Sequence, residues 1–201
     1  MGEAIDRGRR QLLTVATTLT GAVGMAFAAA PFLASWKPSA RAKALGAPVE
    51  IDASKLEPGA MLKIEWRGKP VWVLRRTPEM IGKLDAIDKL LADPASEQSK
   101  QPDYAKNAAR AVNPEYFVVL GVCTHLGCAP MSQFHPGEAK LSAKIGAEWP
   151  GGFYCPCHGS MFDLSGRVFR DVPAPTNLEV PSYTFADSGH IMIGLDPEKA
   201  A

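Results

Sequence analysis

The chain has little cysteine and histidine and no excess of charge of either sign. Its 201 residues include four cysteines and four histidines. Lysine and arginine together number 22 against 21 acidic residues, a net charge of +1. This balance gives no indication of a nucleic-acid-binding protein or of an acidic partner, and we expect no nucleic acid among the partners. The 18 glycines and 17 prolines interrupt the chain often, which favours short strands and loops over long helices.

One stretch near the N-terminus has no charge at all. Between Arg10 and Lys37 lie 26 uncharged, mostly apolar residues. As a helix, residues 11–36 would extend roughly 39 Å, more than the ~30 Å hydrocarbon core of a bilayer requires. A cleaved signal peptide is the alternative, but its apolar run usually spans only about 7–15 residues. We therefore predict a single transmembrane anchor over residues 11–36.

The segments on either side of the anchor differ in character. Paired Arg9 and Arg10 look like a twin-arginine export signal, which is a receptor-read address, and residues 1–10 are the predicted cytoplasmic N-terminus. Basic residues flank the anchor equally on both sides, so the positive-inside rule does not decide its orientation. Residues 37–48 are small, polar and unpatterned, which predicts a flexible hinge linker before a head domain over residues 49–201.

The head is predicted to be an antiparallel β domain with one inserted helix. Apolar and polar residues alternate over 61–66 and 71–76 around a glycine turn, which is typical of a hairpin. A helical period over 78–92, with Thr77 as N-cap, predicts the helix, and residues 95–114 resemble a polar surface loop. Further short strands are expected at 116–122, 153–155, 166–169, 178–185 and 190–195.

All four cysteines lie in two short motifs, "CTHLGC" (123–128) and "CPCHGS" (155–160), and each motif also holds a histidine. A zinc finger would place a cysteine pair before a histidine pair. A pure disulfide framework would leave both histidines unexplained, and no base or orienting group accompanies a catalytic cysteine. The pattern favours one metal site shared by the two motifs.

These motifs resemble those of the Rieske iron–sulfur proteins of cytochrome bc and b6f complexes. The twin arginine, the single anchor, the linker and "VPAPTNLEVP" (172–181) occur where that family has them. The resemblance implies an all-β Rieske-type antiparallel β-sandwich head with one inserted helix, preceded by a single N-terminal transmembrane helix. The cluster-binding part would span residues 116–176.

The resemblance also implies the ligands of one [2Fe–2S] Rieske cluster. Cys123 and Cys155 would bind one iron, and His125 and His158 the other. Imidazoles in place of two thiolates lower the negative charge of the cluster and raise its potential above that of an all-cysteine ferredoxin. The two histidines would also accept a hydrogen bond and a proton from quinol, which is the catalytic role we expect for them.

The remaining cysteines, Cys128 and Cys157, form a disulfide in the family. Structural disulfides persist in oxidising compartments such as the periplasm. This agrees with the export signal and sets the orientation that the charges leave open. We expect a single-pass protein of the bacterial inner membrane with its head in the periplasm.

Other positions near the motifs have expected roles. Ser160 would donate a hydrogen bond to a bridging sulfide. Respiratory Rieske proteins often carry tyrosine two positions later, as a donor to a ligand sulfur, where this chain has Phe162. Leu126 would shield the cluster and touch the quinone pocket. A stiff loop containing Pro173, Ala174 and Pro175 would cover the cluster, with valine at position 172 where glycine is commoner. His135 and His190 are expected at the surface.

The function implied is that of the electron-transfer subunit of a quinol–cytochrome c oxidoreductase, an enzyme complex of the respiratory chain. Its partners would be cytochrome b and c-type cytochrome subunits in a dimeric complex, with quinol as substrate. The alternative is the small Rieske subunit of an exported molybdenum oxidoreductase such as arsenite oxidase. A soluble Rieske ferredoxin or oxygenase would lack the anchor and the disulfide cysteines, and a structural zinc module would show no redox activity.

Overall fold

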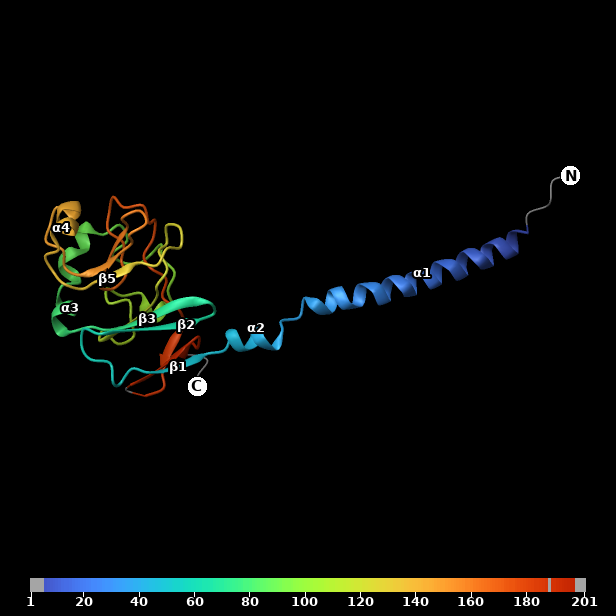
Figure 1. The fold of residues 1–201 in the computed structure, drawn as a ribbon, viewed down its shortest axis with the longest axis horizontal. Helices are drawn as coiled ribbons and strands as arrows, with labels where there is room; N and C mark the ends of the chain where they lie inside the picture. Colours follow the sequence, from blue (N-terminus) through green and yellow to red (C-terminus); the bar gives the residue numbers. More distant parts are fainter. Residues whose placement is uncertain (1–5, 188, 198–201) are drawn as a thin grey trace. The chain divides into compact units, whose positions relative to one another are not determined.

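The computed structural model describes residues 6–187 and 189–197. The chain divides into two compact units, with the boundary between Ala44 and Leu45. The first unit is built on one long helix, α1 (Arg7–Ser35), followed by α2 (Ala40–Leu45) (Figure 1).

Helix α1 satisfies its own polar groups. The Asp6 carboxylate caps it and accepts hydrogen bonds from the amides of Gly8 at 3.0 Å and Arg9 at 3.2 Å. Four threonine hydroxyls donate to the carbonyl four residues earlier, each at 2.8 Å, from Thr14, Thr17, Thr18 and Thr20. By length and composition the helix can cross a bilayer, as the uncharged stretch predicts.

The observed helix differs slightly from the predicted anchor over 11–36. It begins at Arg7, so that Arg9 and Arg10 are helical, and it ends at Ser35. The segment 37–48, expected to be irregular, contains α2. Its role as a hinge stays a prediction.

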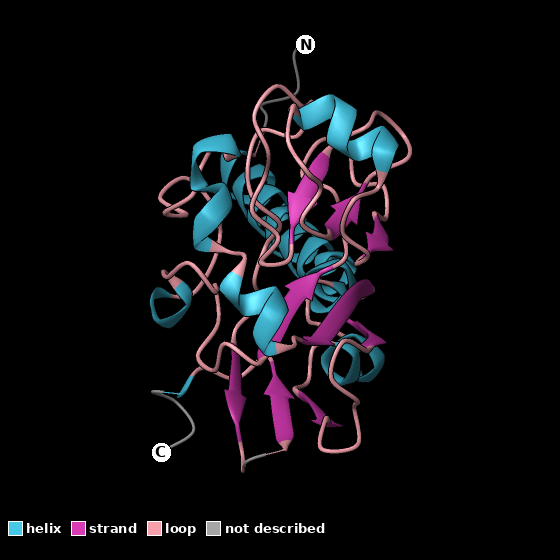
Figure 2. Ribbon diagram, turned by 90° about the vertical axis from the view of Figure 1, so that its left-hand side faces the viewer, coloured by secondary structure: helices cyan, strands magenta, loops and turns pink. Residues whose placement is uncertain are grey.

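The described residues of the head form three three-stranded antiparallel sheets (Figure 2). The order β2-β3-β4 joins Met61–Trp66, Lys69–Arg75 and Tyr116–Leu120, and the order β1-β9-β8 joins Val49–Asp52, His190–Ile193 and Tyr183–Phe185. The third sheet has the order β5-β6-β7 and joins Met131–Gln133, Gly152–Tyr154 and Met161–Asp163. The β2-β3-β4 sheet lies between the other two (Figures 1 and 2).

The predicted hairpin and the predicted buried strand are both present. Strands β2 and β3 are joined at Arg67 and Gly68, whose φ angles of 52° and 70° suit a primed turn that matches the twist of the strands. Strand β4 is buried at every position and leads toward the first cysteine motif.

The single helix expected over 78–92 is divided in two. The Thr77 hydroxyl caps α3 (Pro78–Gly82) by accepting from the Met80 amide at 3.2 Å. A 3-10 helix, η1 (Asp85–Leu90), then follows. Gly82 weakens a continuous helix, and Leu91 leaves the helical period to form a bridge with Phe169.

The prediction of a polar surface loop over 95–114 is only partly correct, because the segment is largely exposed but has several buried residues. The segment contains a 3-10 helix, η2 (Asp103–Ala105), and its Ser96 and Arg110 are fully buried. Arg110 donates to the carbonyls of Ser165 at 3.2 Å and Gly166 at 3.4 Å, so its charged group is hydrogen-bonded inside the head. The polar composition therefore gave no sign of the buried side chains within this segment.

Two further elements depart from the sequence pattern. Helix α4 (Ala139–Ile145), which ends at Gly146 in the left-handed conformation, was not expected. Residues 166–169 form isolated bridges instead of a strand.

Most of the buried side chains belong to one core that runs from the β1-β9-β8 sheet to the cysteine motifs. Phe153 of β6 packs on Trp72 of β3, with ring centroids 5.4 Å apart, and on Phe117 of β4 at 6.5 Å. Cys123 and Cys155 are members of the same core. The site therefore lies where the core meets the end of the head formed by β5, β6 and β7.

Candidate metal centre

The first motif is a tight loop closed by its own backbone. The Cys123 amide donates to the Cys128 carbonyl at 2.7 Å, and the Gly127 amide donates back to the Cys123 carbonyl at 3.0 Å. Gly127 has a φ of +83°, a conformation that glycine adopts without strain. The first cysteine and the glycine of "CTHLGC" are therefore placed by the loop itself.

The second motif has the same pattern of backbone hydrogen bonds as the first. The Cys155 amide donates to the Ser160 carbonyl at 2.8 Å, and the Gly159 amide donates to the Cys155 carbonyl at 2.9 Å. Gly159 has a φ of +79°. The two motifs differ in sequence but have the same loop conformation, so Cys123 and Cys155 occupy equivalent positions at the start of their loops.

The structure brings the four expected ligand side chains together in two pairs. Cys123 and Cys155 are free thiols, both buried and each 2% exposed. The rings of His125 and His158 are nearly perpendicular, with centroids 4.8 Å apart; His125 is half-buried and His158 is exposed. Two sulfur donors inside and two nitrogen donors toward solvent form a set suited to iron–sulfur chemistry, and the residues fit the implied group.

The electrostatics of Cys123 reflect this crowded setting. Burial raises the pKa of its thiol, and so does the adjacent Cys155 thiol. Hydrogen bonds from the His125 amide and the Ser160 hydroxyl act in the opposite direction and lower that pKa. The site thus supplies donors for a thiolate that a bound metal would stabilise further.

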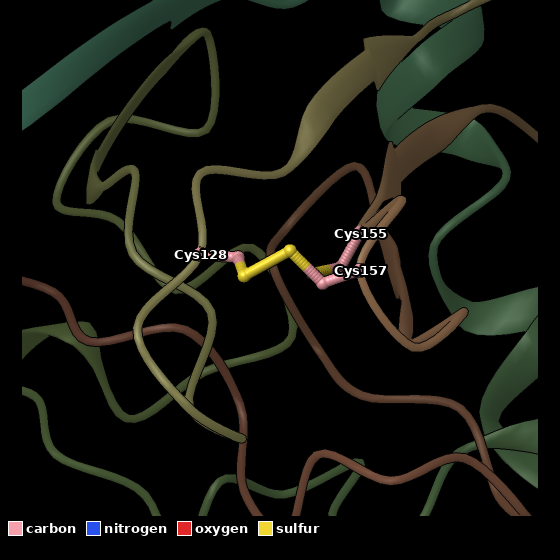
Figure 3. A group of neighbouring side chains, drawn as sticks. All are labelled: Cys128, Cys155 and Cys157. Atoms are coloured by element: carbon pink, nitrogen blue, oxygen red, sulfur yellow. A yellow bond between two sulfur atoms is a disulfide. The ribbon is translucent and has the colours of Figure 1, made fainter.

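Cys128 and Cys157 form a disulfide that joins the two loops, as the resemblance implies. The Cys155 sulfur lies within 4.8 Å of both disulfide sulfurs (Figure 3). These three sulfurs are not a ligand set, because two of them are bonded to each other. The bridge leaves Cys155 and Cys123 as the thiols of the site.

The loop formed by residues 172–177, which we call the cover loop, is fastened to both motifs. The Ala174 amide donates to the Ser160 hydroxyl oxygen at 3.0 Å, and the Thr124 hydroxyl donates to the Thr176 carbonyl at 2.6 Å. Ala174 is buried, whereas Pro173 and Pro175 are exposed. One hydrogen bond to each motif holds the cover loop beside the site.

Other predicted positions differ in their exposure. Leu126 is 72% exposed beside His125, and Phe162 is fully buried in β7. His135 is exposed, as expected. His190 is half-buried and pairs with Asp187 at 2.9 Å, which raises the pKa of the imidazole.

Sequence reasoning missed two polar residues that hold the site. Thr124 ties the first motif to the cover loop, and Asn177 is a fully buried hydrogen-bonding centre behind that loop. The available signal was position alone: Thr124 lies inside the first motif, and Asn177 follows the two prolines.

Comparison with known proteins agrees with this geometry. The family model "Ubiquitinol-cytochrome C reductase Fe-S subunit TAT signal" matches residues 3–39, and "Rieske [2Fe-2S] domain" matches residues 94–184. The chain is 53% identical to the ubiquinol-cytochrome c reductase iron-sulfur subunit of Allochromatium vinosum, over 96% of this chain and 92% of that protein. The subunit of the same name from Blastochloris viridis is 43% identical over 96% of each chain. The protein therefore belongs to the family of ubiquinol-cytochrome c reductase iron-sulfur subunits.

Proposed function

We propose that this chain is the electron-transfer subunit of a quinol–cytochrome c oxidoreductase, an oxidoreductase complex of the respiratory chain. The single observation that supports this most strongly is the donor set: two buried thiols and two outward imidazoles, on twin loops joined by a disulfide. The relatives bear the name of this subunit, which favours it over the small Rieske subunit of an arsenite oxidase.

Cys123 and Cys155 would hold one iron of a single [2Fe–2S] cluster, and His125 and His158 would hold the other. When bound, the cluster takes up and releases one electron at a potential that its two imidazole ligands raise. The protein supplies the enclosure, because both thiols are buried in the core, and the orientation, because both loops have the same backbone frame.

The imidazoles carry the proton chemistry at the surface of the head. His158 is exposed and His125 half-buried, so a ring nitrogen of either can accept a hydrogen bond from a quinol hydroxyl and then its proton. Leu126 projects from the same loop and offers an apolar surface to the quinol ring. Ser160 contributes a hydroxyl donor on the buried side.

The setting follows from the anchor, the signal and the disulfide. Helix α1 is long and apolar enough to hold the chain in the bacterial inner membrane as a single-pass protein. The export signal and the oxidised Cys128–Cys157 pair favour a head in the periplasm. There it would work with cytochrome b and a c-type cytochrome in a dimeric complex, and the linker over 37–48 would let it move between them.

The test is the electron paramagnetic resonance spectrum of the reduced complex, isolated from membranes with this chain in place. A reduced two-iron signal with mixed sulfur and nitrogen ligands supports the proposal, and it should disappear in His158→Ala. The matched control is His135→Ala, an exposed histidine outside both motifs. A zinc-loaded protein with no such signal would overturn the proposal, and copurification with a molybdenum enzyme instead of cytochrome b would favour the alternative complex.

A further inference from the structure

The last residue of the cover loop, Asn177, is a buried anchor for which the sequence predicts no role. Asn177 ends the loop and is only 1% exposed. Its side-chain oxygen accepts from the Val168 amide at 2.8 Å. Its side-chain nitrogen donates to the Asp93 carbonyl at 2.9 Å and to the Ser96 hydroxyl at 2.8 Å. The Asn177 side chain therefore joins the cover loop to the segment that begins at Asp93.

That segment, residues 93–99, is itself shaped to receive Asn177. The Asp93 carboxylate is buried and accepts from the amides of Glu97 at 2.8 Å and Gln98 at 3.1 Å. It also accepts from the Ser99 hydroxyl at 2.7 Å, whose oxygen in turn accepts from the Asn177 backbone amide at 3.0 Å. The segment thus holds Asn177 by both its side chain and its backbone.

The orientation of the amide is fixed by chemistry. A backbone N–H can only donate, so the group facing Val168 must be the amide oxygen, and a carbonyl can only accept, so the group facing Asp93 must be the nitrogen. An aspartate at position 177 would keep the acceptor and the shape but lose both donors. It would also place a carboxylate oxygen against the Asp93 carbonyl in a buried site.

The opposite end of the same short loop controls the Ser160 hydroxyl. The Ala174 amide donates to the Ser160 oxygen, so the single Ser160 proton is left for an acceptor on the side of the site, where the Ser160 hydroxyl lowers the pKa of the Cys123 thiol. Only two residues, Pro175 and Thr176, separate Ala174 from Asn177, and the proline has a fixed φ angle, so the loop transmits a displacement with little slack.

We infer that Asn177 is a positioning residue for the cluster: by fixing the cover loop to residues 93–99, it keeps the Ala174 amide on the Ser160 hydroxyl and the hydroxyl proton on the sulfur side. This rests on the proposed function, because the hydroxyl bond matters for a cluster whose negative charge grows on reduction. A hydrogen bond donated to a cluster sulfur favours the reduced state of the cluster, so loosening this anchor lowers the midpoint potential.

The experiment uses the full-length protein in its membrane complex and two measurements. Hydrogen–deuterium exchange reports the loop directly, since prolines have no amide and the peptide 173–176 contributes only the Ala174 and Thr176 amides. We expect Asn177→Asp to accelerate exchange there by on the order of tenfold, the effect of one lost hydrogen bond. Redox titration of the same sample should give a lower potential.

Two comparisons separate positioning from general weakening. Tyr104→Phe removes a half-buried hydroxyl that bonds the amide and carbonyl of Tyr183 in the distant β1-β9-β8 sheet, and it should lower thermal stability without changing the potential. In a Ser160→Ala background, Asn177→Asp should cause no further fall in potential, because its route through the hydroxyl is gone. Ser99→Ala, a milder variant, should lower the potential in the same direction.

The outcomes are distinct. An intact cluster with an unchanged potential and unchanged exchange in Asn177→Asp and Ser99→Ala would overturn the inference. So would an equal fall in Tyr104→Phe, or full additivity with Ser160→Ala. A wild-type complex that contains no reducible cluster would instead overturn the proposed function itself.

Discussion

Two regions of the head are held together by different kinds of bond. In the base, by which we mean the β2-β3-β4 and β1-β9-β8 sheets, β2, β3 and β4 span six, seven and five residues, and their backbones pair in continuous register. At the cluster end, β5, β6 and β7 span three residues each. There the loops are fixed by a disulfide and by hydrogen bonds between side chains and backbone.

Because the two regions are held together differently, substitutions that lower stability and substitutions that alter function should fall in different regions. A sheet stabilises many residues together, so a change within it alters the folding of the whole head. The cluster end is determined residue by residue, so a single change there can alter the environment of the metal while the base stays folded. The predictions that follow test this separation, beginning with the residue that belongs to both ends.

Phe153 should be the costliest single truncation. It lies in β6 but packs on Trp72 and Phe117 of the basal sheet and on Phe134 beside β5. Phe153→Ala should lower the free energy of unfolding by about 3–5 kcal/mol and release the cluster as well. Chemical denaturation followed by circular dichroism and by cluster absorbance measures both. A variant that loses the cluster while the base keeps its wild-type stability would show that the ends are independent.

Removing the disulfide should weaken the cluster end selectively. The bridge closes a loop with a sequence separation of 29 residues, for which the chain-entropy model gives about 3–4 kcal/mol. Cys128→Ser combined with Cys157→Ser should therefore leave a bound cluster that is lost faster on warming. The decay of the visible absorbance of the cluster measures this loss, and wild-type protein whose disulfide has been chemically reduced is the matched control. Wild-type cluster lifetime in the double variant would contradict a stabilising role.

Adding a hydroxyl at position 162 should change the potential with little effect on folding. Phe162 is fully buried at the position where the resemblance to respiratory Rieske proteins leads us to expect a tyrosine donor to a ligand sulfur. Phe162→Tyr should raise the midpoint potential by roughly 20–60 mV, the electrical equivalent of one net hydrogen bond. Redox titration of the complex decides this. A lowered or unchanged potential would mean that the new hydroxyl does not reach the sulfur.

The basal histidine should affect stability slightly and the potential not at all. Asp187 raises the pKa of His190. The resulting stabilisation is complete below the unfolded pKa of about 6.5 and is lost as pH rises through the raised folded value. The stability difference between wild type and Asp187→Asn should thus shrink from pH 6 to pH 9, and both groups are exposed enough for salt to reduce it. A difference that grows with pH would reverse the assigned sign.

Regular pattern made the base predictable. Alternation over 61–66 and 71–76 predicted the β2–β3 hairpin, and the apolar run beginning at Tyr116 predicted β4. The hairpin depends on the alternation of side chains and on one turn glycine, and β4 depends on its continuous apolar run. The two cysteine motifs were equally readable, because ligand chemistry restricts which residues can stand there.

The remainder depends on partners that are distant in the sequence. Arg110 is polar, and nothing nearby indicates that its guanidinium is buried against carbonyls more than fifty residues later. Asn177 likewise looks like a turn residue until Asp93 and Ser96 are placed against it. Long-range pairing of buried polar groups has no period, so pattern reasoning could not find it.

The close spacing of the sulfur atoms imposes an order on biosynthesis. In the proposed function Cys155 must stay reduced to serve as a ligand, yet its sulfur lies within 4.8 Å of the two sulfurs of the disulfide. An oxidant that reached the metal-free chain would find competing thiols at contact range and could join the wrong two. Loading the metal before the chain leaves the reducing cytoplasm removes two of the four thiols from that competition, and a twin-arginine signal is the kind of address that sends a protein across already folded. The signal at one end of the chain and the spacing of sulfurs at the other thus answer the same chemical problem.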